Sequence, residues 1–192
     1  MNVGLYFGSF NPIHIGHLMV AEYMHSCAHL DEVWFIVSPQ NPFKSKKDLL
    51  AERLRLEMVE LAIGNNPKLK ASDIEFDLPQ PSYTFNTLEK LKGQYPKYVF
   101  SLIMGSDNLE FLNKWHRIED ILNTHDVHVY QRNNDILESP IQGNFIYHKA
   151  PQVDVSGTYI RQTIQDQKSI KYLVSQTVEE FIQLNNLYSG EE

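Results

Sequence analysis

The chain has little cysteine, no long apolar run and no excess of positive charge. Its single cysteine, Cys27, cannot form an internal disulfide, so we expect a buried or idle thiol there. No stretch approaches the roughly 18 apolar residues of a membrane span, and the N-terminus lacks a basic segment followed by a long apolar one. These absences predict a cytoplasmic protein that works without a membrane.

The net charge of −7 argues against a broad nucleic-acid-binding surface, which is normally basic. Small anionic substrates remain compatible with this charge where cations converge locally. Lys44, Lys46 and Lys47 form one such concentration, and Arg53 and Arg55 follow it. For Lys46 and Lys47, a solvated basic loop is an equally good interpretation. We expect no nucleic-acid partner.

A length of 192 residues suits one α/β domain with a sizeable core, and we expect a single domain over residues 1–192. Short apolar stretches alternate with segments of helical periodicity, which predicts a doubly wound, Rossmann-like parallel sheet with helices on both faces. Strands are expected at 3–8, 33–37, 71–76, 98–104, 127–130 and 145–148. Helices are expected at 15–30, 51–63, 109–112 and 118–122, after a cap at Ser82 or Thr84, and from about Thr158 and Ser175.

Ligands of such sheets bind beyond the carboxyl ends of the strands, where the strand order reverses. The loops that follow the strands at 3–8, 33–37, 98–104 and 145–148 should therefore meet in one cleft. The segments 39–50 and 133–143 have the composition of loops.

The most informative loop is GSFNPIHIGH, residues 8–17, between the first strand and the first helix. Gly8 frees the backbone to turn, and the first amides of the helix lack internal partners and attract an anion. His14 and His17 add imidazole donors, and Gly16 leaves room for a ligand beside the backbone. These features predict a polyphosphate site. A metal site is the weaker interpretation, because the two histidines offer only two ligands and no third is evident nearby.

This loop resembles the (T/H)xGH signature of the nucleotidyltransferase superfamily, which includes small adenylyl- and cytidylyltransferases and class I aminoacyl-tRNA synthetases. The chain is too short for a synthetase. Four further segments, in order and over nearly the whole chain, are similar to those of bacterial nicotinate mononucleotide adenylyltransferases. They are SPQNPFK (38–44), SYTFNTL (82–88), GSDNLEFLNKW (105–115) and VSGTYIR (155–161).

The resemblance implies an enzyme of NAD biosynthesis that joins nicotinate mononucleotide to ATP, giving nicotinate adenine dinucleotide and pyrophosphate. The implied catalytic residues are His14, His17, Lys44 and Arg161. The implied ATP-binding residues are Gly8, Ser9, Phe10, His14, Gly16, His17, Gly105, Asp107, Ser156, Thr158 and Arg161. The implied mononucleotide-binding residues are Ser9, Lys44, Tyr83, Thr84, Asn108 and Trp115. Magnesium is expected to arrive on the ATP phosphates, and the helices from about residue 158 are expected to complete the triphosphate site.

The chemistry of several of these residues fits the implied roles, although each has a plainer interpretation. Tyr83 and Thr84 at a helix start offer amides and a hydroxyl to a carboxylate, and Trp115 offers a flat face to an aromatic ring. Without the resemblance, Thr84 would be interpreted as a helix cap and Trp115 as a core residue. Asp107 can accept hydrogen bonds from a ribose hydroxyl or cap the next helix. The SGTYIR segment can hold outer phosphates or be an ordinary capping pattern around Ser156.

Two positions depart from the family pattern. Phe43 stands where a histidine is usual beside Lys44, so the mononucleotide phosphate has to do without that donor or draw one from Lys46, Arg53 or Arg55. In addition, Gly157 replaces a small hydroxyl residue and keeps only its backbone amide.

Several alternatives stay open. The nearest is phosphopantetheine adenylyltransferase, which shares HxGH but lacks the segments corresponding to 82–88 and 105–115. A different class is a non-catalytic nucleotide sensor that retains the fold. Preference for the acid or the amide mononucleotide and the formation of a homo-oligomer are also left open.

Overall fold

Six parallel strands form one sheet in the order β3-β2-β1-β4-β5-β6. The computed structural model describes residues 1–39, 49–131 and 138–190. The strand order reverses between β1 and β4, which is the switch point of a doubly wound fold, and the predicted fold class is confirmed. The strands are β1 (Asn2–Gly8), β2 (Glu32–Val37), β3 (Leu69–Ser72), β4 (Val99–Gly105), β5 (Val127–Tyr130) and β6 (Phe145–His148).

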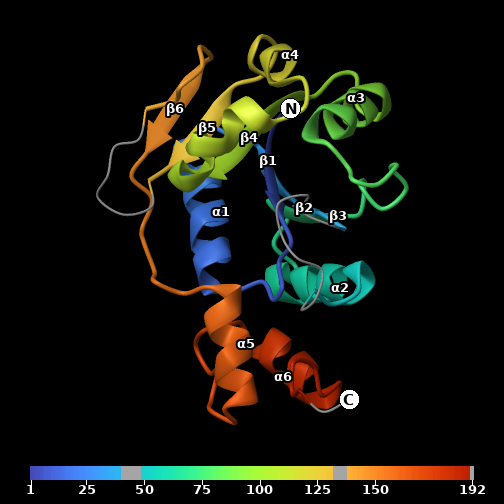
Figure 1. Cartoon of the computed structure of the whole chain (residues 1–192), viewed down its shortest axis with the longest axis vertical. Helices are drawn as coiled ribbons and strands as arrows, with labels where there is room; N and C mark the ends of the chain where they lie inside the picture. The colour runs from blue at the N-terminus through green and yellow to red at the C-terminus, as the bar shows by residue number, and fades with distance from the viewer. Residues whose placement is uncertain (40–48, 132–137, 191–192) are drawn as a thin grey trace.

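Helices cover both faces of this sheet, and the two C-terminal helices lie together at one end of the molecule, next to α2 (Figure 1). No helix in the part of the chain that the structure describes is long and apolar enough to cross a membrane. The α-helices are α1 (Ile15–Cys27), α2 (Glu52–Ile63), α3 (Thr84–Gln94), α4 (Ile118–Leu122), α5 (Gly157–Gln165) and α6 (Gln176–Leu184), and η1 (Ser106–Lys114) is a 3-10 helix.

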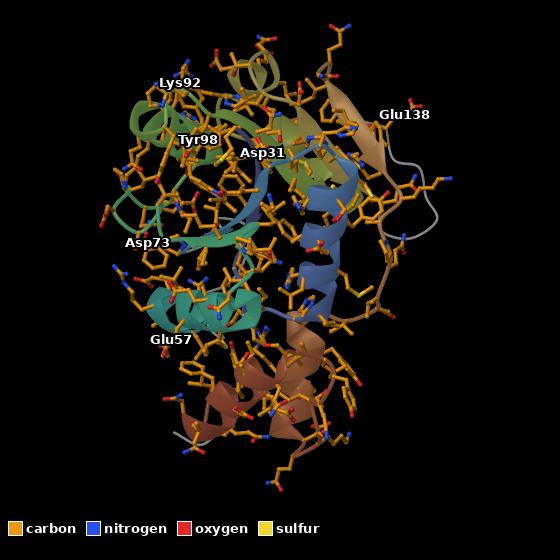
Figure 2. All side chains as sticks on the ribbon, turned by 180° about the vertical axis from the view of Figure 1, so that it is seen from behind. Asp31, Glu57, Asp73, Lys92, Tyr98 and Glu138 are labelled. Carbon is orange, nitrogen blue, oxygen red and sulfur yellow. The ribbon has the colours of Figure 1, made fainter. Side chains whose placement is uncertain are left out.

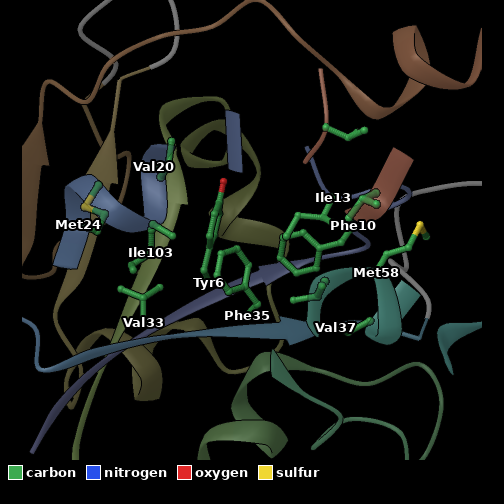
Figure 3. Packing of buried hydrophobic residues seen from close by; sticks show 14 of the residues in the cluster. Tyr6, Phe10, Ile13, Val20, Met24, Val33, Phe35, Val37, Met58 and Ile103 are labelled. Carbon is green, nitrogen blue, oxygen red and sulfur yellow. The ribbon is translucent and has the colours of Figure 1, made fainter. Parts of the chain in front are cut away.

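The strands bury side chains on both faces, as expected for a parallel sheet covered twice. In β1, Leu5 belongs to a core shared with α3, η1 and α4, whereas the next residue, Tyr6, belongs to a core shared with α1, α2, α5 and α6. Figure 3 shows the second of these cores, in which the rings of Tyr6, Phe10 and Phe35 lie together. The sheet is therefore packed on both faces, and its carboxyl edge positions the loops that follow the strands.

The strand predicted at 71–76 is wrong in its position. β3 ends at Ser72, and turns follow in which the Phe76 amide donates to the Asp73 carbonyl at 2.8 Å and Leu78 to Glu75 at 3.1 Å. A half-buried strand with this alternation would expose Glu75 on its polar face. Glu75 is in fact only 2% exposed.

Two helices also differ from the prediction. α1 ends at Cys27, which is exposed, because His29 adopts φ 53° and the Nδ1 atom of His25 lies 2.8 Å from the carbonyl oxygen of Leu30. The short helix predicted at 109–112 is part of the longer 3-10 helix η1. Helix α4 and strands β5 and β6 have the predicted boundaries.

A pair of histidines joins β5 to β6. The Nδ1 atom of His128 lies 3.0 Å from Nε2 of His148, and His128 is only 5% exposed. Burial, aided by the neighbouring His148, lowers the pKa of His128 to about 4, while Asp126 opposes this shift. Burial also lowers the pKa of His148. The pair is therefore neutral in the folded protein at pH 7.

We expect this pair to make folding sensitive to acid. In the unfolded chain the His128 imidazole binds a proton as the pH falls below about 6.5, whereas the folded protein resists until about 4. The contribution of His128 to the free energy of unfolding is therefore fully present above pH 6.5 and is lost as the pH falls towards 4. We expect the free energy of unfolding, measured by urea denaturation, to fall between pH 7.5 and pH 5 in the parent. This fall should be about 2 kcal/mol smaller in His128→Asn.

The matched control is His29→Asn, an exposed position where a left-handed conformation suits asparagine. This variant should lose as much stability at pH 5 as the parent. Equal acid losses in the parent and in His128→Asn would contradict the prediction.

Candidate functional site

The loop between β1 and α1 lies at the carboxyl edge of the sheet, beside the switch point. Gly8 pairs with Val37 at the end of β2, and the Ser38 amide donates to the Gly8 carbonyl at 2.9 Å. Phe10 has φ 44° and is only 2% exposed, so its side chain belongs to the core and not to a ligand surface. Of the residues predicted to bind ATP, Phe10 can offer only its backbone.

The two histidines of this loop lie against each other. His14 is the N-cap of α1, and its ring stacks on that of His17 with centroids 3.7 Å apart. The backbone N–H of His14 donates to Nδ1 of His17 at 3.3 Å. Because Nδ1 accepts this bond, the neutral His17 ring carries its proton on Nε2, which makes Nε2 a hydrogen-bond donor. Phe10 supports the ring from behind with centroids 5.1 Å apart.

Gly16 makes room for the His14 ring. A Cβ atom at this position would lie 3.2 Å from Cε1 and Nδ1 of that ring, which is closer than ordinary packing. A side chain at residue 16 would therefore displace the His14 imidazole.

The amides at the start of α1 are partly occupied. The Ile15 amide donates to the carbonyl of Leu173, from the segment between α5 and α6, at 2.9 Å, and the His17 amide donates to the His14 carbonyl at 3.0 Å. Two of the amides that were predicted to be open to an anion therefore already have hydrogen-bond partners.

Helix α5 approaches the same loop from the C-terminal part of the chain. Arg161 donates from Nη1 to the Asn11 carbonyl at 2.8 Å and from Nη2 to Oγ1 of Thr158 at 3.3 Å. Ser156 caps the helix by accepting from the Tyr159 amide at 3.2 Å. A Cβ atom on Gly157 would lie 2.7 Å from the Asn11 carbonyl oxygen. The departure at Gly157 thus allows α5 to start directly against the histidine loop.

Asn11 fixes this loop to two further segments. Its Oδ1 atom accepts from the hydroxyl of Tyr188 at 2.8 Å and from the Leu50 amide at 3.3 Å. Burial raises the pKa of Tyr188, so the phenol remains protonated and keeps donating. The loop that carries the histidines is therefore held by a residue near the C-terminus and by the residue two positions before α2.

Arg55 is fully buried and does not supply a phosphate donor. Its guanidinium donates to the carbonyls of Ser9 at 2.6 Å, Ser38 at 2.8 Å and Pro39 at 3.0 Å, and to that of Leu50 at 2.9 Å. Burial lowers its pKa from the ordinary value for arginine. The alternative in which Arg55 replaces the missing histidine donor is wrong, because Arg55 ties together the loops that follow β1 and β2.

The neighbouring Arg53 is exposed and pairs with Asp73 at 3.2 Å. Asp73 is labelled in Figure 2. Lys44, Lys46, Lys47 and Phe43 lie outside the described residues.

A second group of predicted residues lies around the starts of η1 and α3. Asp107 and Asn108 are in the first turn of η1, directly after β4, and Nδ2 of Asn108 lies 3.4 Å from the Gly105 carbonyl oxygen and 3.3 Å from Oδ1 of Asp107. Trp115 ends η1 and packs partly against the core. Its neighbour His116 contacts Tyr83, with ring centroids 4.8 Å apart, so η1 and the start of α3 lie side by side.

The predicted cap of α3 is wrong. Tyr83 is the N-cap and contributes no side-chain cap bond, and Thr84 is the first helical residue. The Ser82 hydroxyl instead donates to the buried carboxylate of Glu75 at 3.0 Å. The sequence analysis missed Glu75, because its hydroxyl partners cannot be identified from local spacing.

A cavity of about 180 Å³ lies elsewhere, between the edge strand β3 and α3. It is lined by residues that include Trp34, Lys70 and Tyr95 and by no predicted site residue, and the Lys70 ammonium lies 4.0 Å from the Trp34 ring centroid. Within residues 1–39, 49–131 and 138–190, no group of three or more His, Cys, Asp or Glu side chains is arranged to hold a metal ion.

Comparisons with known proteins agree with this geometry. The sequence model of the cytidylyltransferase-like family matches residues 5–163. A protein of Flavobacterium psychrophilum named "probable nicotinate-nucleotide adenylyltransferase" is 49% identical, over 98% of this chain and 99% of its own. A protein of Cytophaga hutchinsonii with the same name is 48% identical, over 99% and 100% of the two chains. The solved structure of Plasmodium falciparum nicotinic acid mononucleotide adenylyltransferase complexed with NaAD has the same fold, with a TM-score of 0.80, 21% identity and coverage of 99% and 98%.

Proposed function

Because this chain belongs to the nicotinate-nucleotide adenylyltransferases of the cytidylyltransferase-like family, we propose that it joins nicotinate mononucleotide to ATP. The products are nicotinate adenine dinucleotide and pyrophosphate, in NAD biosynthesis. The observation that carries the proposal is the stacked pair His14–His17 at the switch point, with Arg161 bonded to the same loop. A cytoplasmic location follows from these substrates, which are soluble metabolites.

The reaction needs no protein nucleophile. An oxygen of the mononucleotide phosphate, already anionic at pH 7, attacks the α-phosphorus of ATP, and the bond to the bridging oxygen of the β-phosphate breaks. Negative charge then grows on the departing pyrophosphate. The protein contributes alignment of the two phosphates and donors directed at the developing charge.

The triphosphate is assigned to the side of the site formed by the histidine loop and α5. Nε2–H of His17 is directed at the phosphates, and Arg161 has N–H donors beyond the two that it uses on Asn11 and Thr158. Magnesium enters as part of the ATP substrate, bound to the phosphate oxygens. Residues 1–192 act as one domain in which α5 and α6 complete this half of the site.

The mononucleotide is assigned to the side formed by the starts of η1 and α3. The uncapped N-terminus of α3 at Tyr83 and Thr84 suits the pyridine carboxylate, and Trp115 offers a ring face. Ser9, Asn108 and Lys44 are the further candidates for this ligand.

Trp115→Ala tests the stacking part of this assignment. We expect the KM for the mononucleotide to rise about 5-fold or more, which corresponds to roughly 1 kcal/mol of lost stacking, with kcat within about twofold. Steady-state kinetics at saturating ATP measure both values. Phe111→Ala, which removes an exposed ring from the same 3-10 helix, is the matched control and should leave KM unchanged. An unchanged KM in Trp115→Ala would contradict the stacking role.

The activity itself is tested by pyrophosphate release from ATP in parallel reactions with nicotinate mononucleotide, nicotinamide mononucleotide and phosphopantetheine. We expect rapid release with the first, together with the dinucleotide product. Faster release with phosphopantetheine would favour the sister enzyme. Nucleotide binding without release from any acceptor would favour the non-catalytic sensor.

A further inference from the structure

A buried carboxylate connects the two loops on the mononucleotide side of the site. Glu75 is 2% exposed, and it accepts hydrogen bonds from Oγ1 of Thr87 at 2.7 Å and from the Ser82 hydroxyl at 3.0 Å. The Ser38 hydroxyl also interacts with this carboxylate. Burial raises the pKa of the Glu75 carboxyl, and these three hydroxyls oppose that shift.

The donors to Glu75 come from the segments that shape the mononucleotide side. Ser82 and Thr87 flank the N-terminus of α3, whose cap residue Tyr83 provides no side-chain bond. Ser38 directly follows β2 and opens the segment that leads towards Lys44. One carboxylate, in the turns that follow β3, therefore fixes the position of the α3 N-terminus through two hydrogen bonds.

The cost of burying a carboxylate makes this arrangement informative. A carboxylate withdrawn from water is expensive unless its oxygens accept several hydrogen bonds. Lys90 of α3 donates to the Ile74 carbonyl at 3.0 Å and lies 3.8 Å from Asp77, whereas the donors to Glu75 are the hydroxyls of Ser82 and Thr87. No side chain caps α3, and the Asn86 amide donates to the Tyr83 carbonyl at 2.9 Å, so the amides that precede Asn86 are the ones assigned to the ligand.

We propose that Glu75 is a positioning residue for the mononucleotide, holding the α3 N-terminus in place through Ser82 and Thr87. The proposal rests on the function proposed above. Glu75 is not expected to touch substrate. Its loss should weaken mononucleotide binding selectively, because the histidine loop and α5 make their own contacts to the rest of the molecule.

Glu75→Gln tests this role, because the amide keeps the shape but can accept fewer hydroxyl bonds. We expect the KM for nicotinate mononucleotide to rise about 10-fold while the KM for ATP and the affinity for ATP alone, measured calorimetrically, stay within about twofold. Glu89→Gln, an exposed acid on α3, is the matched control and should behave as the parent. An equal rise in both KM values, or no rise in either, would overturn the proposal.

A second pair of variants keeps the test decisive if Glu75→Gln fails to fold. Thr87→Val removes one donor to Glu75, and Thr87→Ser retains it. We expect Thr87→Val to raise the mononucleotide KM several-fold and Thr87→Ser to restore it. Equal KM values for the two variants would overturn the proposal. Failure of the proposed function is distinguishable, because the parent enzyme itself would then release no pyrophosphate with nicotinate mononucleotide.

Discussion

His17→Ala is expected to lower kcat by about 100-fold or more, with little change in the stability of the fold. The Nε2–H donor of His17 is fixed in direction, because its Nδ1 accepts the His14 amide and its ring is stacked on His14 and supported by Phe10. A donor held in this way loses nothing to reorientation as charge builds on pyrophosphate. Pyrophosphate release under saturating substrates measures the effect.

The matched control for His17→Ala is His29→Asn, which alters an exposed histidine beyond the end of α1. This variant should turn over at the rate of the parent. A turnover of His17→Ala within twofold of the parent would refute its assignment to transition-state stabilisation.

Arg55→Met is expected to destabilise the protein by at least about 3 kcal/mol, because four carbonyls would lose a charged donor inside the core. Methionine fills part of the volume but donates nothing. The carbonyls of Ser9 and Ser38 belong to the loops after β1 and β2, so we expect the KM values for both substrates to rise. Urea denaturation gives the loss of stability, and KM values for both substrates give the loss of site geometry.

Arg53→Met is the matched control for Arg55→Met. Arg53 lies on the same helix but is exposed, and its ion pair with Asp73 is solvated. We expect a change in the free energy of unfolding within about 0.5 kcal/mol. Similar losses in the two variants would show that Arg55 has no special structural role.

Much of the fold was predictable, because most strands are short apolar stretches and the longer helices have a periodic apolar face. The boundaries of β5, β6 and α4 match the prediction for this reason. The prediction at β3 failed because Glu75 is an inward-facing acid, and no local pattern distinguishes a buried carboxylate from an exposed one. The three hydroxyls that accommodate Glu75 belong to other segments of the chain.

The site was predictable where it depends on a local motif and unpredictable where it depends on distant contacts. His14 and His17 lie as the motif indicates, at the start of a helix that follows a buried strand. The contacts of Asn11 with Tyr188 and of Arg55 with Ser9 join residues 177 and 46 positions apart. Local spacing carries no information on such pairs, so Arg55 was interpreted as a candidate phosphate donor.

The most direct test of the account is a crystal structure of the protein with a non-hydrolysable ATP analogue. We predict phosphate oxygens about 3 Å from Nε2 of His17 and within hydrogen-bond distance of Arg161, at the carboxyl edge between β1 and β4. Triphosphate bound elsewhere, with both imidazoles turned into the apolar core, would contradict the account.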